Sequence, residues 1–277
     1  MLNRLNDRGY EIQYESHAAA VLAQDFPQAL SDIEQVLEQF SVPIGEIIGS
    51  GGGESKGTQR LRHALADLGW PFKTYVISKR INEVPRQSIS HEVDHVKSFT
   101  GPWEGKKDIA LEIEWNNKDP FFDRDLENFK RLHAEGAISV GVVITRGASL
   151  QKGMRDIVIR YAQEQKINSF DDLARLGIGQ TVPQRNDIER RVKNTGDFAA
   201  SWANVFTASK FGEATTHWKK LMDRVTRGVG SPCPLLLIGF PIDIISFDTR
   251  SPLDAAAIEP RDLESKPIGS TDEFLQD

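Results

Sequence analysis

Two glutamates lie two positions apart inside the most apolar stretch of the chain, Ile109-Ala110-Leu111-Glu112-Ile113-Glu114-Trp115. Successive side chains of a β-strand point to opposite faces, so this spacing places Glu112 and Glu114 on the same face. Burying even one unpaired carboxylate is costly, and a divalent cation offsets that cost. Mg²⁺ prefers one or two carboxylates, completed by water and phosphate oxygens. A cation held there can activate water and stabilise the charge that develops during phosphodiester cleavage.

A third carboxylate is expected from a neighbouring strand. Asp94 lies 18 positions before Glu112, behind a turn at residues 101–105 that contains glycine and proline. This spacing suits two adjacent antiparallel strands joined by a loop. Asp108, four positions before Glu112, is the other candidate. Its place at the entrance of the strand favours a solvated role, so Asp94 is the preferred third acid.

Two other interpretations of these residues stay open. In the first, the acids are exposed on an edge strand and are neutralised by nearby lysines at positions 106, 107 or 118. In the second, His91-Glu92-Val93-Asp94-His95 is the H-E-x-x-H motif of a zinc metallopeptidase, in which a helix aims both histidines at the metal. The charge of Asp94 and the absence of a helical apolar stripe count against this second interpretation.

Hydrophobic periodicity indicates the elements that must position the acids. Asp119 is expected to cap a helix over 120–133, and a buried strand follows at 138–144. Strand, helix and strand within about 35 residues form a crossover unit, which makes the two strands parallel. Residues 151–228 read as mostly helical. Further elements are expected as helices at 16–40, interrupted at Pro27, and at 58–68, and as strands at 73–81 and 235–240.

Composition narrows the class of protein. The 277 residues are expected to form a single domain, with a helical region at about 1–50 and a flexible acidic tail at about 255–277. No apolar stretch is long enough for a membrane span, and a single cysteine excludes a disulfide framework and a multi-cysteine zinc site. These features fit the cytoplasm. The net charge is −6, although residues 151–228 carry 14 basic and 9 acidic side chains, a local net charge of +5.

Val93-Asp94-His95-Val96-Lys97, followed by the segment from Ile109 to Asn117, resembles the catalytic segment of the BamHI, BglII and BstYI restriction endonucleases, in the PD-(D/E)xK nuclease class. The pattern of that group is an aspartate, a spacer, and Glu-x-Glu or Glu-x-Gln at the end of an apolar strand. Similarity covers about 55–150 and 205–245, whereas 151–205 is longer here. The resemblance implies an α/β fold with a mixed, mainly five-stranded sheet flanked by helices, and an active site at one sheet edge.

The same resemblance implies a type II site-specific deoxyribonuclease that uses Mg²⁺ to hydrolyse double-stranded DNA at a short palindromic site, GATC-centred in relatives, and leaves 5′-phosphates. Asp94, Glu112 and the carbonyl of Ile113 would ligate the metal, and Glu114 would orient or deprotonate the attacking water. The residues expected to contact DNA are Asn116, Asn117, Lys118, Ser209, Lys210, Arg224 and Arg227.

Assembly follows from the same comparison of residues. The helix at 120–133 is similar to the dimer-forming helix of that group, and a twofold homodimer would match a palindrome with one active site for each strand. A partner methyltransferase is expected to protect host DNA. A DNA-binding protein that kept the fold without catalysis is the remaining alternative, and the presence of all three acids counts against it.

Overall fold

The computed structural model describes residues 1–49, 55–101 and 106–247. The helices are α1 (Asn3–Asp7), α2 (Ala18–Asp25), α3 (Pro27–Gln39), α4 (Ile44–Gly49), α5 (Lys56–Asp67), α6 (Phe121–Ala134), α7 (Ala148–Glu164), α8 (Phe170–Arg175), α9 (Val182–Thr195), α10 (Phe198–Lys210) and α11 (Trp218–Thr226). The strands are β1 (Glu11–Glu15), β2 (Val42–Pro43), β3 (Lys73–Ile81), β4 (Val84–Val93), β5 (His95–Thr100), β6 (Lys106–Glu114), β7 (Ile138–Arg146), β8 (Leu235–Phe240) and β9 (Ile245–Ser246).

The central sheet has five strands in the order β1-β8-β7-β6-β5. Strands β6, β7 and β8 run parallel, while β1 and β5 pair antiparallel at the two edges. Helix α6 provides the crossover between β6 and β7, which the chain order of the three elements requires. The structure therefore confirms the predicted mixed five-stranded sheet flanked by helices, and the predicted parallel pairing of its central strands.

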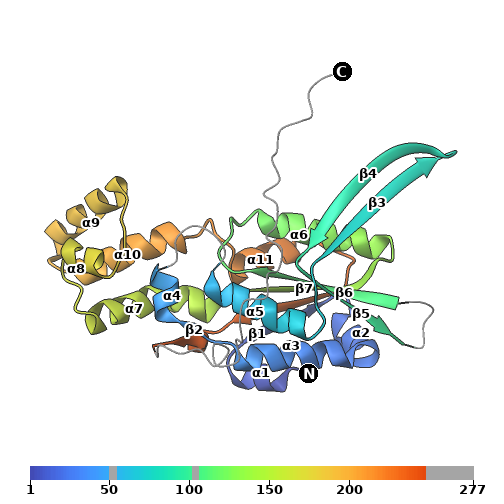
Figure 1. Cartoon of the computed structure of the whole chain (residues 1–277), viewed down its shortest axis with the longest axis horizontal. Coiled ribbons are helices and arrows are strands. Elements are labelled where there is room, and N and C mark those ends of the chain that lie inside the picture. The colour runs from blue at the N-terminus through green and yellow to red at the C-terminus, as the bar shows by residue number, and fades with distance from the viewer. Residues whose placement is uncertain (50–54, 102–105, 248–277) are drawn as a thin grey trace.

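Helices cover both faces of this sheet (Figure 1). Alternate residues of β6 separate the two faces, because Ile109, Leu111 and Ile113 pack in the cluster that includes α3, whereas Ala110 packs in the cluster that includes α6. The even-numbered positions of β6 therefore face α6. Glu112 and Glu114 are even-numbered, so the sheet presents both carboxylates to that helix.

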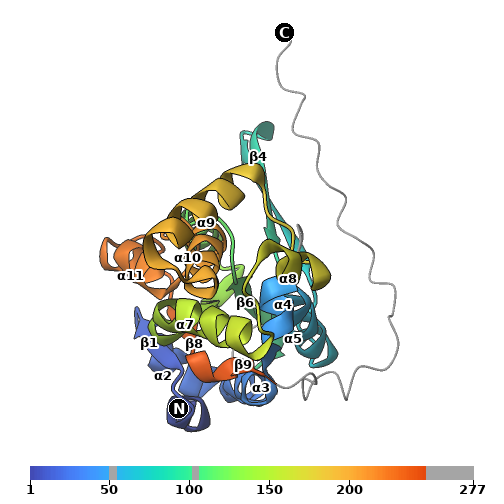
Figure 2. The same cartoon turned by 90° about the vertical axis from the view of Figure 1, so that its left-hand side faces the viewer.

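The segment from α7 to α10 lies together at one end of the molecule (Figures 1 and 2). Phe170 of α8 and Phe198 of α10 stack edge to face, with ring centroids 5.0 Å apart. Helix α9 begins with a capping box, in which Thr181 and Gln184 bond reciprocally to each other's backbone amides. The predicted helical character of this region is confirmed, and the helices extend the body away from the acid-bearing strand.

Several predicted elements are confirmed, and three details differ. The helix at 16–40 divides at Pro27 as expected, because proline is accepted at the first turn of α3. Asp119 is not the cap of α6: the cap is Pro120, and Asp119 lies near Lys220 and Arg224. The strand at 73–81 forms a separate two-stranded ribbon with β4, and the fifth strand of the sheet is the unpredicted β1.

Some sequence predictions fall outside the described residues. These are most of the turn at 101–105 and the acidic tail at about 255–277. Across the described ranges, no helix combines the length and the apolar character that crossing a membrane demands.

Helix α6 is held against the sheet by a close contact at Gly141 of β7. A side chain at this position would overlap the ring of Phe129, which is fully buried. We predict that Gly141→Ala lowers the free energy of unfolding by about 1–3 kcal/mol, since overpacking forces a tight core to shift. Gly45→Ala is the matched control, because nothing lies within 4 Å of that position. Urea unfolding of both variants measures the difference, and equal stabilities would contradict this packing.

Candidate active site

The predicted acids meet where β5 begins and β6 ends. Glu112 and Glu114 are buried, with 4% and 2% of their surface exposed. Asp94 occupies the bend between β4 and β5, and its backbone amide donates a hydrogen bond to Glu112 Oε1 at 3.4 Å. The antiparallel register of β5 on β6, in which His95 pairs with Leu111, brings Asp94 level with Glu112. The structure therefore gathers all three predicted carboxylates.

A fourth acid, Asp125 of α6, completes the cluster and was not predicted. It is 1% exposed, and electrostatic interactions link it to both Glu112 and Glu114. Its position carries a signal that could have been used, since Asp125 lies three residues after Phe122 and four before Phe129 on the buried stripe of α6. A carboxylate on the stripe that packs over an acid-bearing strand belongs to the same site.

Burial and mutual repulsion raise the pKa values of the acids. Burial, followed by the charges of Asp94, Asp125 and Glu114, raises the pKa of Glu112 well above its ordinary value. Burial and the neighbouring Asp125 raise the pKa of Glu114 to about 9, and burial also raises the pKa of Asp125. The carboxyls of Glu112, Glu114 and Asp125 therefore favour their protonated forms.

Arg124 and Asn117 oppose this repulsion at Glu114. Arg124 Nη2 lies 2.8 Å from Asp125 Oδ1 and 3.7 Å from Glu114 Oε1, but its side chain is 55% exposed. Asn117 Nδ2 donates a hydrogen bond of 2.7 Å to Glu114 Oε2. The solvated guanidinium and the amide leave the pKa values of Glu112, Glu114 and Asp125 raised.

Asp108 lies outside the acid cluster and has hydrogen-bond donors of its own. Ser98 Oγ and Tyr75 OH each donate to it at 2.6 Å, and Lys73 Nζ lies at 2.5 Å. Burial works to raise its pKa, but these three donors hold the pKa of Asp108 below its ordinary value. The expected solvated role is wrong, because Asp108 is 6% exposed. Its carboxylate is already neutralised, so Asp94 is the third member of the cluster.

The zinc-peptidase interpretation fails on secondary structure. Residues 91–95 run through the end of β4, a bend and the start of β5, and no helix aligns the two histidines. His91 Nδ1 pairs with Asn128 Oδ1 at 2.8 Å, and His95 Nδ1 pairs with the carbonyl of Trp70 at 3.3 Å. Burial lowers the pKa of His95 to about 4. Both rings serve as structural hydrogen-bonding groups.

The donors of the acid cluster fit a hard divalent cation. Asp125 Oδ2 is buried, and no N–H or alcohol O–H donates to it in the described part of the chain. Pairing with β5 ends at Leu111, so the peptide of Ile113 lies beyond the last paired residue of that edge. In the described ranges no group of three or more acids, histidines or cysteines is arranged to hold a metal alone. Mg²⁺ commonly takes only one or two carboxylates and completes its shell with water and substrate phosphate.

The first predicted DNA contacts follow β6 directly. Asn116 Oδ1 is buried and lacks a donor among the described residues, while Asn117 and Lys118 are exposed. The segment is anchored by Arg146, whose Nε donates to the carbonyl of Trp115 at 2.8 Å and whose Nη2 donates to the carbonyl of Thr216 at 2.7 Å. These three residues directly follow the strand that carries Glu112 and Glu114.

The two arginines predicted to contact DNA differ in exposure and in their partners. Arg224 is 7% exposed, and its guanidinium pairs with Asp123 at 2.8 Å and with Asp119 at 3.5 Å. Arg227 is exposed, and its Nε donates to the carbonyl of Asp223 at 2.9 Å. In this conformation Arg224 secures α11 to the start of α6, whereas Arg227 keeps an exposed guanidinium.

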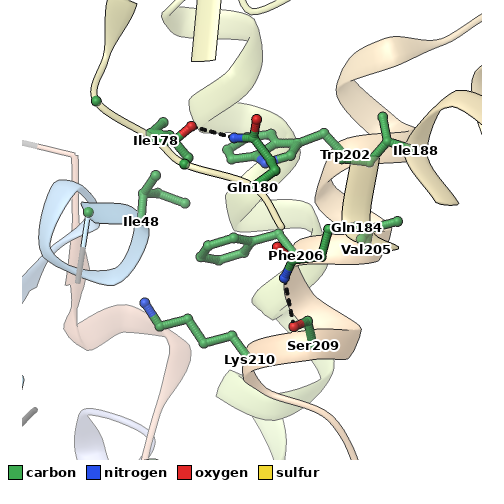
Figure 3. A pocket seen from close by; sticks show the side chains of 13 residues that line it. Ile48, Ile178, Gln180, Gln184, Ile188, Trp202, Val205, Phe206, Ser209 and Lys210 are labelled. Atoms are coloured by element: carbon green, nitrogen blue, oxygen red, sulfur yellow. Dashed lines mark hydrogen bonds between the residues drawn. The ribbon is translucent and has the colours of Figure 1, made fainter. Parts of the chain in front are cut away.

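Ser209 and Lys210 lie away from the acid cluster, at the end of α10. They line a cavity of about 440 Å³ between α4, α10 and the loop that joins α8 to α9 (Figure 3). Ser209 Oγ accepts from Gln184 Nε2 at 2.9 Å, and Lys210 Nζ donates to the carbonyl of Ile47 at 2.9 Å. None of the four acids lines this cavity, so the structure does not bring these two residues into the acid site.

Comparison with known proteins gives one finding. Residues 10–240 match the family described as restriction endonuclease BglII/BglIII. This range includes the whole acid cluster and every strand of the central sheet. No curated protein matches the chain.

The raised pKa of Glu114 has a consequence for stability. Between the ordinary value of 4.5 and about 9 the folded carboxyl keeps its proton while the unfolded one loses it, so stability falls as pH rises through this window. Glu114→Gln cannot titrate and mimics the protonated acid. In EDTA, we predict a gain on the order of 1–3 kcal/mol at pH 8 and a small one at pH 5.

Urea unfolding at the two pH values measures this gain. Glu127→Gln is the matched control, because Glu127 lies on the outer part of α6 beside Lys130 and its side chain is 39% exposed. A Glu114→Gln gain of equal size at both pH values, or a loss at pH 8, would contradict the assigned protonation.

Proposed function

The chain belongs to the BglII/BglIII restriction endonuclease family, and from this premise we propose that it is a type II enzyme that uses Mg²⁺ to cut both strands of a short palindromic DNA site. The observation that carries the proposal is the cluster of Asp94, Glu112 and Glu114, joined by Asp125, on one face of the sheet. Buried acids with raised pKa values are typical of sites that act on substrate.

Each acid has a distinct part in the proposed reaction. Asp94 and Glu112, with the carbonyl of Ile113, would hold the cation. When bound, Mg²⁺ stabilises charge on the phosphate oxygens and lowers the pKa of water. Glu114 Oε2 is held by Asn117, which directs its other oxygen toward the neighbouring acids and Arg124. Glu114 would orient the attacking water and accept its proton, and in-line attack would leave a 5′-phosphate.

Phosphate and base contacts are proposed for the exposed residues around the acids. Asn116 would pair with adenine in the major groove after its amide, whose Oδ1 is buried in this conformation, turns toward solvent. Asn117 and Lys118 would meet the phosphates that flank the scissile bond. Arg227 is suited to the same role. For Arg224, Ser209 and Lys210 a DNA contact stays a prediction, and Arg224 would first have to leave two aspartates.

Symmetry links the proposed enzyme to its substrate. Two copies related by a twofold axis would place one acid cluster on each strand of a palindrome. The apolar stripe of α6 is buried against the sheet, so a dimer contact through this helix would use its outer, polar face. A GATC-centred site, a cytoplasmic location and a methyltransferase that protects host DNA complete the proposal.

Glu112→Ala tests the proposal at its centre. We predict that this variant loses at least about a thousandfold in cutting rate, because one metal ligand is removed, while most DNA binding remains. Digestion of a phage DNA of known sequence with Mg²⁺, followed by sequencing of the ends, measures cutting. Filter binding in Ca²⁺ measures affinity.

The matched control is Glu92→Ala. Glu92 is an exposed acid of β4, two residues before Asp94, and its loss changes the net charge by the same amount. It should cut at the wild-type rate. Wild-type cutting by Glu112→Ala would remove the acid cluster from the reaction, and loss of cutting by Glu92→Ala would revive the role of the H-E-x-x-H segment.

A further inference from the structure

The ribbon of β3 and β4 projects beyond the body of the molecule (Figure 1). Its proximal half packs on the protein through one face: Tyr75 and Ile77 contact the cluster under α6, and their partners across the ribbon are His91 and Ile89. The opposite face of this half carries Val76, which is 64% exposed. Residues 78–88 are exposed throughout, so both faces of the distal half are solvated.

A ribbon of this kind lacks internal support. An isolated two-stranded hairpin is at best marginally stable in water. Among the large hydrophobic residues exposed in the described structure, Val76, Ile81 and Val84 all lie on this ribbon. The distal half therefore fits a surface that a partner covers.

The chemistry of the distal half indicates an anionic partner. Residues 79–86 carry three basic side chains and one acidic one in a chain whose net charge is −6. Lys79 lies 3.8 Å from Glu135, a partly screened contact. For Arg80 and Arg86, no hydrogen bond or ion pair is present in the described part of the chain. Positive side chains left without intramolecular partners are available to phosphates.

The shape of the ribbon suits a nucleic-acid groove. Lys79 pairs with Gln87 and Arg80 pairs with Pro85, which leaves Arg86 as the extra residue of a bulge. A bulge increases the right-handed twist of a ribbon. The major groove of B-DNA admits a two-stranded ribbon. On the exposed face, Ser78 lies opposite Ser88, and hydroxyls of this kind commonly bond to phosphate oxygens.

We propose that the β3–β4 ribbon is an arm that binds double-stranded DNA outside the cleaved site, with Arg80 and Arg86 on backbone phosphates. The arm is continuous with the acid cluster, since β4 ends one residue before Asp94. Its ten residues extend about 30 Å at 3.3 Å per residue. At 3.4 Å per base pair, the arm reaches about nine base pairs along the duplex. This inference rests on duplex DNA as the substrate and adds a contact to flanking DNA.

The test compares wild type, R80A/R86A and R80K/R86K on a 40-base-pair random-sequence duplex in Ca²⁺ over a range of salt concentrations. Loss of two phosphate contacts lowers the slope of log K against log salt by about two. We expect R80A/R86A to weaken binding about tenfold near 0.1 M salt, and R80K/R86K to stay within about twofold of wild type. E83Q, which removes the acid of the ribbon tip, should bind more tightly than wild type.

Several outcomes would overturn the proposed arm. An unchanged salt slope in R80A/R86A would exclude phosphate contacts. If R80A/R86A instead sediments as a monomer while the wild type sediments as a dimer, the ribbon is a contact between copies. Equal losses in the alanine and lysine variants would indicate a perturbed ribbon. The cutting assay of the wild type tests the proposed function separately. If the wild type cuts DNA but R80A/R86A leaves the salt slope unchanged, only the proposal of the arm is wrong. If the wild type binds no duplex DNA, both the proposed function and the proposed arm are wrong.

Discussion

Burial of three carboxylates, those of Glu112, Glu114 and Asp125, beside the half-buried Asp94 is the constraint on which this structure depends. An ionised carboxylate in an apolar environment is too costly to persist without a partner, so each acid either keeps a proton or meets a cation. Arg124 is too exposed to neutralise the cluster, and Asp108, with three donors of its own, shows how the same fold stabilises an acid that has only a structural role. Perturbed pKa values of this kind cluster at functional sites.

The rest of the molecule holds this cluster together. The parallel core of β6, β7 and β8 fixes the strand that carries Glu112 and Glu114, and the antiparallel edge strand β5 brings Asp94 beside it. Helix α6 presses Asp125 onto the same face through the contact of Phe129 at Gly141. Arg146, buried at the end of β7, then fixes the backbone that leaves the site toward Asn117. The sheet, the crossover helix α6 and the segment that follows β6 therefore all position the same carboxylates.

The sequence was informative where a local pattern sets the structure. Two acids in an apolar strand, a spacer to Asp94 and a strand–helix–strand unit predicted two parallel strands, an antiparallel neighbour and three of the four acids. The five-stranded sheet was implied by the resemblance to known endonucleases. Asp125 was missed because its meaning depends on which strand its helix covers, a tertiary fact. The short strand β1 is specified by pairing with β8 more than by its own residues. Arg224 was assigned to DNA from the resemblance to known endonucleases, whereas its aspartate partners become visible only when α11 docks on α6.

The most direct test of the account is a calorimetric titration of Mn²⁺ into the protein at pH 7.5, in two buffers with different heats of ionisation. Because Glu114 keeps a proton up to about pH 9, a cation that binds the cluster must displace protons. The account predicts binding with release of about one proton or more, and loss of that binding in Glu112→Ala. Binding without proton release, or binding that Glu112→Ala leaves intact, would show that the buried acids are not the cation site.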